Sequence, residues 1–309
     1  MGHSECAAIA ENAGKVIVGK KRVLELMIVA LLAEGHVLVE DVPGLGKTLI
    51  AKAIARSIGG EFRRIQFTPD LLPADVTGFS IYDQKAGAFV FHPGPVVCNV
   101  LLADEVNRTI PRTQASLLES MGEFQLTVDG NTIVLPKPFF VIATQNPIEM
   151  DGTFPLPEAQ LDRFLMRIDV GYPSKEEEIA IMDRFQKDQP LEELHAVTDP
   201  ESVGTLQKQR GSVTVSPAVR EYVADLVAAT RSHPTVRFGV SPRGSLALIH
   251  SAQGLAMLRG RDYVLPDDVK ELARPVLLHR IILKHDERTR GATAEAVLED
   301  VLANVPVTV

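Results

Sequence analysis

Short apolar runs alternate with helix-spaced apolar positions in the first half of the chain. Residues 20–33 carry apolar side chains at three- and four-residue spacing, the pattern of an amphipathic helix: Val23, Leu26, Met27, Ala30 and Leu31. A second helix is predicted at 47–57. Strands are predicted at 36–40, 61–67, 98–104, 139–144 and 164–170. Because strands alternate with helices, the pattern predicts an α/β fold with a parallel sheet flanked by helices.

Two segments interrupt this alternation and predict hairpins. Residues 79–92 alternate in polarity around Lys85-Ala86-Gly87, and residues 124–135 turn at Asp129-Gly130, a strong hairpin signal. Such hairpins are either structural decoration or working loops of a phosphate-binding core.

From about Ser174 the pattern becomes helical. Helix starts are predicted at a capping box of Ser174 with Glu177, at Ser216-Pro217, at Ser241-Pro242 and at Leu265-Pro266, with a last helix over 292–303. The stretch 186–213 is polar and reads as an irregular joint. The pattern therefore predicts two domains, an α/β domain over 1–190 and a helical lid over 191–309.

The composition describes a soluble globular protein, which we expect in the cytoplasm. Of the 309 residues, 45% are hydrophobic and 23% are charged, values typical of globular domains. No apolar run reaches the roughly 18 residues that span a bilayer, and the N-terminus lacks the pattern of a secretory signal. Membrane insertion is therefore not expected. The net charge of −8 argues against a surface built mainly for nucleic acid.

The stretch LVEDVPGLGKTLIAKAIA, residues 38–55, runs from an apolar strand through a glycine-rich turn into a helix. The usual phosphate-loop spacing would place a first glycine at position 41, where Asp41 stands. Such a turn nevertheless aims backbone N–H groups and a helix dipole at an anion. Lys47 would contact the outer phosphates of a nucleotide, and the Thr48 hydroxyl would bind Mg²⁺. The Asp41 side chain can instead hydrogen-bond within the turn.

Two other strand ends carry polar residues that suit the same chemistry. The strand in NVLLADE, residues 99–105, ends in Asp104, which would hold Mg²⁺, and Glu105, which would orient and polarise the attacking water. The strand in FFVIATQNP, residues 139–147, ends near Asn146. Asn146 can hydrogen-bond the water or the γ-phosphate if its strand lies beside the phosphate-loop strand. The alternative is a simple turn at Asn-Pro.

Two arginines are further candidates. Arg163 comes just before a predicted strand, and Arg243 lies in the first turn of the helix that begins at Ser241-Pro242. A guanidinium at a helix start strengthens a site already favourable to phosphate. The alternative for each arginine is a surface ion pair worth about 0 to 1 kcal/mol. The local sequence does not decide between these readings.

Five stretches, in order along the chain, resemble the MoxR family of AAA+ ATPases: GHVLVEDVPGLGKT, RIQFTPDLLPADVTG, GPVVCNVLLADEVNRTIPRTQASLLESMGE, VIATQNPIEMDGTFPLPEAQLDRFLMRI and GVSPRG. The resemblance covers nearly the whole chain, and EDVPG, with Asp41, belongs to the family pattern. It implies a P-loop NTPase core with five parallel strands, a small all-α lid, and ATP with Mg²⁺ held between them. It also implies a homo-oligomeric ring, usually a hexamer.

The resemblance also assigns roles to the candidate residues. It implies that the nucleotide is held by Val18 and Gly19 at the adenine and by the Walker A segment Pro43, Gly44, Leu45, Gly46, Lys47, Thr48 and Leu49. Asp104 and Glu105 match Walker B, and Asn146 matches sensor 1. Arg163 fits the arginine finger that reaches a neighbouring subunit's ATP, and Arg243 fits sensor 2. The two hairpins match inserts that usually point toward the ring pore.

The function implied is an ATPase that remodels or matures partner proteins in the manner of a chaperone. By resemblance, such proteins commonly act with partners that contain von Willebrand factor A domains, and some insert metal cofactors. One alternative is a motor acting on nucleic acid, against which the acidic balance and the lack of an appended DNA-binding module argue. Another is a regulatory switch whose output is ATP binding. The client protein and the ring size are not readable from the sequence.

Overall fold

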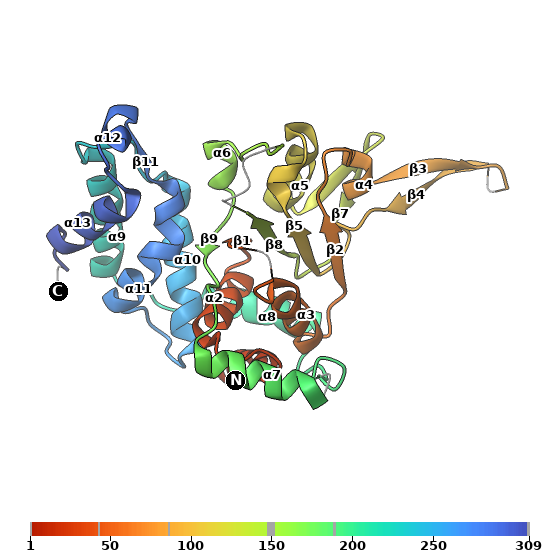
Figure 1. The fold of residues 1–309 in the computed structure, drawn as a ribbon, viewed down its shortest axis with the longest axis horizontal. Coiled ribbons are helices and arrows are strands. Elements are labelled where there is room, and N and C mark those ends of the chain that lie inside the picture. The colour runs from red at the N-terminus through yellow and green to blue at the C-terminus, as the bar shows by residue number, and fades with distance from the viewer. Residues whose placement is uncertain (1, 43, 86, 147–151, 188–189, 308–309) are drawn as a thin grey trace.

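A five-stranded parallel sheet forms the centre of the first part of the chain (Figure 1). The computed structural model describes residues 2–42, 44–85, 87–146, 152–187 and 190–307. The strands lie in the order β2 (Phe62–Gln66), β5 (Val100–Asp104), β8 (Phe140–Gln145), β1 (Val37–Glu40) and β9 (Met166–Ile168). All the pairings are parallel, so the predicted fold class is confirmed.

The central strands are almost continuously apolar because both of their faces are buried. Val39 and Leu102 belong to the hydrophobic cluster on one face of the sheet, and Leu38 and Leu101 belong to the cluster on the other. This alternation follows from the two-residue period of a strand. The polar residues at the carboxyl ends of these strands are thereby brought to one edge of the sheet.

Helices cover both faces of the sheet (Figure 1). The cluster on one face includes residues of α1 (Gly2–Gly14), α2 (Lys21–Leu32) and α3 (Lys47–Ser57). The cluster on the other includes residues of α4 (Pro73–Thr77) and α5 (Pro111–Glu123). Two short elements complete this part of the chain, the 3-10 turn η1 (Val106–Arg108) after β5 and helix α6 (Glu158–Leu161) before β9. The apolar pattern predicted α2 and α3 to within one residue and left α1 unpredicted.

Both predicted hairpins are present. Strands β3 (Gly78–Asp83) and β4 (Ala88–Pro93) form one, and strands β6 (Gln125–Val128) and β7 (Asn131–Val134) form the other. The β3–β4 hairpin projects away from the body of the protein (Figure 1). Residue 86, in its predicted turn, lies outside the described residues. The exposed apolar side chains of the β3–β4 hairpin are Phe79, Ile81, Tyr82, Phe89 and Val90.

The second half of the chain is mainly helical, as predicted. Its helices are α7 (Lys175–Lys187), α8 (Pro200–Arg210), α9 (Pro217–Ser232), α10 (Pro242–Leu258), α11 (Pro266–Leu277), α12 (His285–Thr289) and α13 (Ala294–Asn304). The lid also contains the 3-10 turn η2 (Leu278–Arg280) and a short antiparallel pair, β10 (Val236–Phe238) with β11 (Ile282–Leu283). Among the helices described, none is both long and apolar enough to cross a bilayer.

Two of the three predicted serine caps form the expected hydrogen bonds. Ser174 and Glu177 make the reciprocal bonds of a capping box, at 2.9 and 3.2 Å. Ser216 Oγ accepts from the amide of Val219 at 3.2 Å. Ser241 occupies the N-cap position but makes no such bond. Its hydroxyl instead donates to the carboxylate of Asp162 in the core.

The prediction of an irregular joint over 186–213 is wrong where α8 forms. Asp199 caps this helix by accepting a hydrogen bond from the amide of Ser202 at 2.8 Å. The buried face of α8 includes polar Gln207, whose Nε2 donates to the carbonyl of Leu31 in α2 at 2.8 Å. Because its buried positions are partly polar, α8 lacks the apolar periodicity that would have predicted it. The domain boundary near residue 190 stays a prediction.

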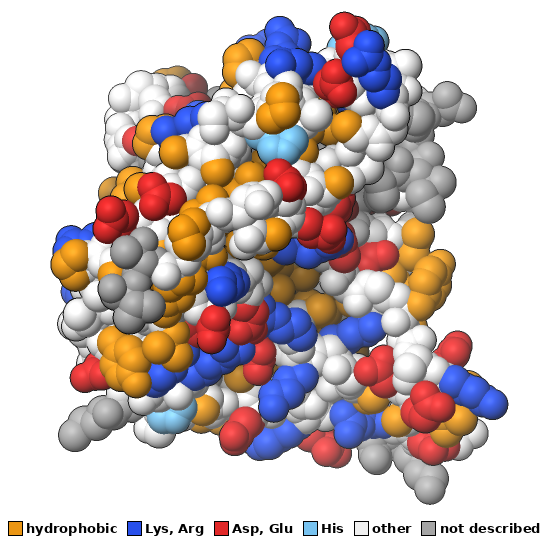
Figure 2. Space-filling model, turned by 90° about the vertical axis from the view of Figure 1, so that its left-hand side faces the viewer, with side chains coloured by type: hydrophobic (Ala, Val, Ile, Leu, Met, Phe, Trp, Pro, Cys, Tyr) orange, Lys and Arg blue, Asp and Glu red, His pale blue; other side chains and the backbone are white. Residues whose placement is uncertain are grey.

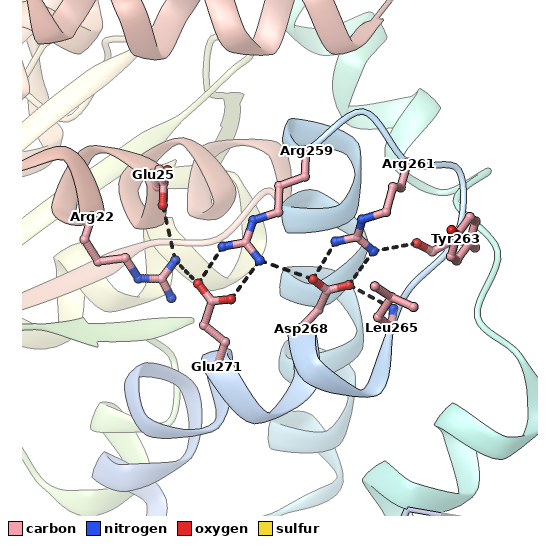
Figure 3. A network of polar contacts seen from close by, with 8 residues as sticks. All are labelled: Arg22, Glu25, Arg259, Arg261, Tyr263, Leu265, Asp268 and Glu271. Carbon is pink, nitrogen blue, oxygen red and sulfur yellow. Dashed lines mark hydrogen bonds and ion pairs between the residues drawn. The ribbon is translucent and has the colours of Figure 1, made fainter. Parts of the chain in front are cut away.

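A polar network joins the lid to the core (Figure 3). Arg22 of α2 pairs with Glu271 of α11 at 2.6 Å, and Arg259 pairs with the same carboxylate at 2.7 Å. Arg259 and Arg261 also pair with Asp268, at 3.5 and 2.6 Å. Through these arginines the end of α10 and the start of α11 are attached to α2.

Candidate functional site

The phosphate loop leaves β1 and enters α3 with two glycines in the left-handed region. Gly44 has φ 88° and Gly46 has φ 79°. A Cβ at either position would meet no atom within 4 Å, so the requirement for glycine is conformational rather than steric. Helix α3 begins at Lys47, directly after Gly46. The first amides of α3 and its dipole are thus available to an anion at the loop. Pro43, also predicted to bind nucleotide, lies outside the described residues.

The side chain of Asp41 accepts hydrogen bonds from backbone amides in two segments, the turn after β1 and the segment after β9. Its Oδ1 accepts from the amide of Val42 at 2.9 Å. Its Oδ2 accepts from the amides of Val170 and Gly171, at 2.9 and 2.6 Å. Part of this pattern matches the expected bond within the turn. The bonds to 170 and 171 go further, because they connect the end of β1 to the segment after β9.

Lys47 is the first residue of α3, and its side chain contacts the start of the loop. Its Nζ donates to the carbonyl oxygen of Asp41 at 2.9 Å. Partial burial lowers the pKa of Lys47 from its usual value, and the negative charges of Asp41, Asp104 and Glu105 act in the opposite direction. This cation faces carboxylates at the ends of β1 and β5, two strands separated in the sheet by β8.

Thr144 contacts both predicted Walker B residues, the carboxylate of Asp104 and the backbone of Glu105. Its Oγ1 donates to Asp104 Oδ1 at 2.6 Å and accepts from the amide of Glu105 at 2.9 Å. Thr144 belongs to β8, which lies between β5 and β1. Glu105 has φ 58°, a left-handed conformation that is uncommon for a residue other than glycine. Glu105 stands between the end of β5 and the start of η1.

Arg64 and Gln66, on edge strand β2, also reach these carboxylates and were missed by the sequence reasoning. Arg64 Nη2 lies 2.7 Å from Asp104 Oδ2, and Gln66 Nε2 donates to Glu105 Oε2 at 2.6 Å. The two-residue spacing places Arg64 and Gln66 on one face of the strand. That spacing was a usable signal, but the pairing of β2 with β5 was not readable from the sequence.

The polar candidates gather around one cavity of about 390 Å³. It is lined by Asp41, Gly44, Gly46, Lys47, Thr48, Leu49, Arg64, Gln66, Asp104, Glu105, Thr144, Gln145 and Asn146. Asn146 was expected to reach the phosphate site if its strand lay beside the phosphate-loop strand. This condition is met, because β8 pairs directly with β1. A hydroxyl, a lysine and two carboxylates in one cavity form the donor set that suits a nucleotide phosphate with Mg²⁺.

A smaller, mostly apolar cavity of about 160 Å³ adjoins the phosphate loop. Gly44, Gly46 and Leu49 line both cavities, and Val18 and Leu45 line the smaller one with Val16, Ile17 and Phe185. An apolar cavity beside a phosphate site suits a nucleotide base. Gly19 lines a third cavity, of about 510 Å³, and does not line the one of 160 Å³. Its contact with adenine stays a prediction.

The two candidate arginines do not line the cavity of their own subunit. Arg163 Nη1 donates to the carbonyl of Leu118 in α5 at 2.9 Å. Arg243 lies exposed in the first turn of α10. An arginine finger acts on a neighbouring subunit, so the position of Arg163 outside its own site agrees with that role without testing it.

Two families match the chain. Residues 36–166 match the ATPase family associated with various cellular activities (AAA), and residues 228–301 match the AAA lid domain. The first match contains the phosphate loop, both predicted Walker B carboxylates and Arg163. The second begins within α9 and contains Arg243.

Several proteins are similar over most of this chain. An uncharacterized protein, YeaC, of Bacillus subtilis is 50% identical over 99% of this chain and 96% of its own length. Chaperone MoxR1 of Mycobacterium tuberculosis is 45% identical over 94% and 79%, and Protein MoxR of Paracoccus denitrificans is 35% identical over 94% and 93%.

The fold also matches a crystal structure from Cytophaga hutchinsonii, of a protein named only as a candidate ATPase. The TM-score is 0.93 at 38% identity, over 100% of this chain and 96% of that one. A likeness of this extent covers the sheet, the loop and the lid together. With the relatives named MoxR, it identifies the chain as a member of the MoxR family of AAA+ ATPases.

Proposed function

We propose that this protein binds ATP with Mg²⁺ and hydrolyses ATP at the cavity around Lys47. The observation that carries this proposal is the joint placement of Lys47, Asp104 and Glu105 around one cavity at the carboxyl edge of the sheet. The adjoining apolar cavity provides a place for the base. Two segments distant in the sequence, the phosphate loop with α3 and the end of β5, are needed to build this arrangement, so it is specific.

The residues of the cavity divide the chemistry among them. Lys47 and the first amides of α3 would hold the outer phosphates, and Thr48 with Asp104 would hold the metal ion. Bound Mg²⁺ supplies positive charge that stabilises the charge developing on the phosphates. Glu105 would orient and polarise the attacking water, and Asn146 would hydrogen-bond that water or the γ-phosphate. Gln66 and Arg108 contact Glu105 here and would release it as the water binds.

We also propose that the subunits assemble into a ring, a hexamer as is usual in the family, and that hydrolysis occurs at the interfaces between them. Arg163 lies against α5, outside the cavity of its own subunit. Its guanidinium would therefore complete the site of a neighbour, as an arginine finger supplied in trans does. Arg243 would contact the nucleotide of its own subunit from the lid. Turnover per subunit should consequently rise with protein concentration as the ring assembles.

The proposed cellular role is chaperone-like remodelling or maturation of partner proteins. One relative is named a chaperone. The projecting β3–β4 hairpin exposes five large apolar side chains, which suits contact with another protein rather than with nucleic acid. A partner containing a von Willebrand factor A domain, and insertion of a metal cofactor into a client, are the finer forms of this proposal.

A concentration series tests the proposal. ATP turnover per subunit is measured from dilute to concentrated protein, with the wild type, Glu105→Gln and the control Glu119→Gln, whose side chain is exposed on α5. We expect turnover to rise with concentration, Glu105→Gln to bind ATP and stall, and the control to match the wild type. Rapid turnover by Glu105→Gln would exclude Glu105 as the activating group.

Two further measurements separate the competing functions. ATP binding without turnover at any concentration would favour a regulatory switch, and stimulation of turnover by DNA would favour a motor on nucleic acid. Capture of partner proteins on Glu105→Gln with ATP, compared with the same variant without nucleotide, tests the chaperone-like role. The stalled variant should hold a client that the nucleotide-free protein does not.

A further inference from the structure

The segment 162–165 contains Arg163 and lies where the core meets the lid. Arg163 itself packs on the core: its Nη1 donates to the carbonyl of Leu118, and a Cβ at Gly122 would lie 2.5 Å from that nitrogen. The residues on either side of Arg163 are held by the lid as well. The backbone that carries this guanidinium is therefore bonded to the lid, whereas the guanidinium itself packs on the core.

Arg280 of the lid holds this segment through several hydrogen bonds. Its Nε donates to Asp162 Oδ1 at 2.7 Å, and its Nη2 donates to the carbonyl of Phe164 at 2.6 Å. A further bond runs from Nη1 to the carbonyl of Leu165 at 3.2 Å. The Arg280 side chain is only 2% exposed. A buried guanidinium with this many partners has little freedom to move without carrying the backbone of 162–165 with it.

The second oxygen of Asp162 is taken by the helix that carries Arg243. Ser241 Oγ donates to Asp162 Oδ2 at 3.1 Å. Gly244, in the first turn of α10, lies so close to Arg280 that a Cβ there would come within 3.0 Å of its Cδ. The carboxylate of Asp162 thus connects the start of α10 to η2, at the residue that directly precedes Arg163.

We propose that Asp162 is a positioning residue that couples the contact of Arg243 with its own subunit's nucleotide to the placement of Arg163 in the neighbouring site. The inference rests on the proposed function, which gives Arg243 and Arg163 these two roles. A shift of the first turn of α10 would pull on Asp162 through Ser241. Because Arg280 fixes the other oxygen, the backbone beside Arg163 must follow. The finger would then be presented when its own subunit holds nucleotide.

Mixing two kinds of subunit tests this coupling. Acceptor subunits carry Arg163→Ala and need a finger from a neighbour, whereas donor subunits carry Glu105→Gln and supply a finger without turning over. Interfaces in a head-to-tail ring are directional, so an equal mixture should recover about a quarter of the wild-type rate. A mixture that stays inactive would contradict the ring and finger assignments themselves, and the coupling would fall with them.

Ser241→Ala is then introduced into one population at a time. In donors it should lower the recovered rate about fivefold or more, the lower range of coupling between two sites. In acceptors it should change the rate by less than about twofold, because their own finger is not in use. Ser241→Thr keeps the hydroxyl and should restore the rate in donors. The control is Ser232→Ala, which removes an exposed hydroxyl that donates to backbone carbonyls of its own helix, α9.

Asp162→Asn gives a second, independent variant that keeps the shape of the side chain and removes its charge. It should show the same asymmetry between donors and acceptors, with unchanged affinity of the donors for a fluorescent ATP analogue. Equal losses in donors and acceptors would overturn the coupling, as would a Ser241→Ala effect no larger than that of Ser232→Ala. A loss of donor affinity large enough to explain the rate would overturn it too.

Discussion

The carboxylate of Asp41 accepts a hydrogen bond from the amide of Gly171 at 2.6 Å, which ties the start of the phosphate loop to the segment after β9. A second bond to the same oxygen comes from the amide of Val170. The backbone carbonyl of Asp41 meanwhile accepts from Lys47. The acidic residue at the position of the usual first glycine is therefore a clamp between neighbouring strands, and its backbone takes part in orienting Lys47.

Asp41→Ala should lower the free energy of unfolding by about 2 kcal/mol, because it leaves amides at 42, 170 and 171 without their acceptor. Urea unfolding measures this loss. Nucleotide affinity should fall as well. The backbone carbonyl of residue 41 accepts a hydrogen bond from Lys47, and the substitution removes the side-chain hydrogen bonds that hold this residue in place. The control Asp262→Ala removes an exposed carboxylate and should change stability by less than about 0.5 kcal/mol. Equal effects of the two variants would contradict the clamp.

Thr144→Val should reduce ATP turnover more than it reduces ATP affinity. The substitution conserves shape but removes the hydroxyl that contacts both Asp104 and Glu105. Thr144 is 1% exposed, so the loss also costs about 1 to 3 kcal/mol of stability. Turnover and binding are measured separately at saturating Mg²⁺. Thr132→Val, on the exposed face of β7, is the matched control, and an unchanged turnover in Thr144→Val would show that the bridge is not needed.

Arg163→Ala should bind ATP with normal affinity and hydrolyse it about 10³- to 10⁵-fold more slowly, the range known for an arginine supplied in trans. The reason is that Arg163 lies outside its own cavity. Binding of a fluorescent nucleotide and steady-state turnover check the two halves of this expectation. Arg112→Ala, exposed on α5, serves as control. Full activity of Arg163→Ala would remove this residue from the site.

The network in Figure 3 should respond unequally to the loss of its two carboxylates. The Asp268 side chain is 2% exposed, pairs with Arg261 and accepts from the amide of Leu265 at the start of α11. Asp268→Ala should therefore cost about 3 kcal/mol, because it removes a helix cap and unpairs a partly buried arginine. Glu271→Ala breaks more exposed pairs and should cost about 1 kcal/mol or less. Thermal or urea unfolding of both variants checks the order.

Acid should destabilise the protein through His36. Burial lowers the pKa of His36 from 6.5 to about 4. Its Nδ1 accepts from the amide of Val141, so Nε2 carries the proton and donates to the carbonyl of Met121. Between pH 6.5 and 4 the unfolded chain binds more protons than the folded one. The free energy of unfolding therefore decreases as the pH is lowered through this window. The contribution of neutral His36 to the free energy of unfolding is present in full above pH 6.5 and amounts to about 3 kcal/mol.

Urea unfolding between pH 7 and 4 measures this dependence. His36→Gln should flatten the curve relative to the wild type, whereas His285→Gln, exposed at the start of α12, should leave its slope unchanged. An identical slope in the wild type and in His36→Gln would assign the acid sensitivity elsewhere. Burial also lowers the pKa of His279, so a residual slope of the same sign is expected in His36→Gln.

Local patterns predicted the elements whose buried positions are apolar and regularly spaced. Helices α2 and α3 and the strands β1, β5 and β8 all match their predicted ranges closely. Helix α8 was missed because Gln207 and Arg210 share its buried face. In the same way, Ser241 was correctly placed before a helix, but its hydroxyl went to Asp162, a partner 79 residues away.

The sequence by itself determined the phosphate loop, the two adjacent carboxylates at the end of β5 and the parallel α/β order, because each depends on residues close together in the chain. Only the tertiary structure decided which strands are neighbours. That order brings Arg64 and Gln66 to the two carboxylates, the Thr144 hydroxyl to Asp104, and Asp41 to the amide of Gly171. Hydrogen bonds of this kind join atoms distant in sequence, and nothing in the local residue pattern encodes the partner. The physical reason is that strand order follows from how both faces of the sheet are buried at once.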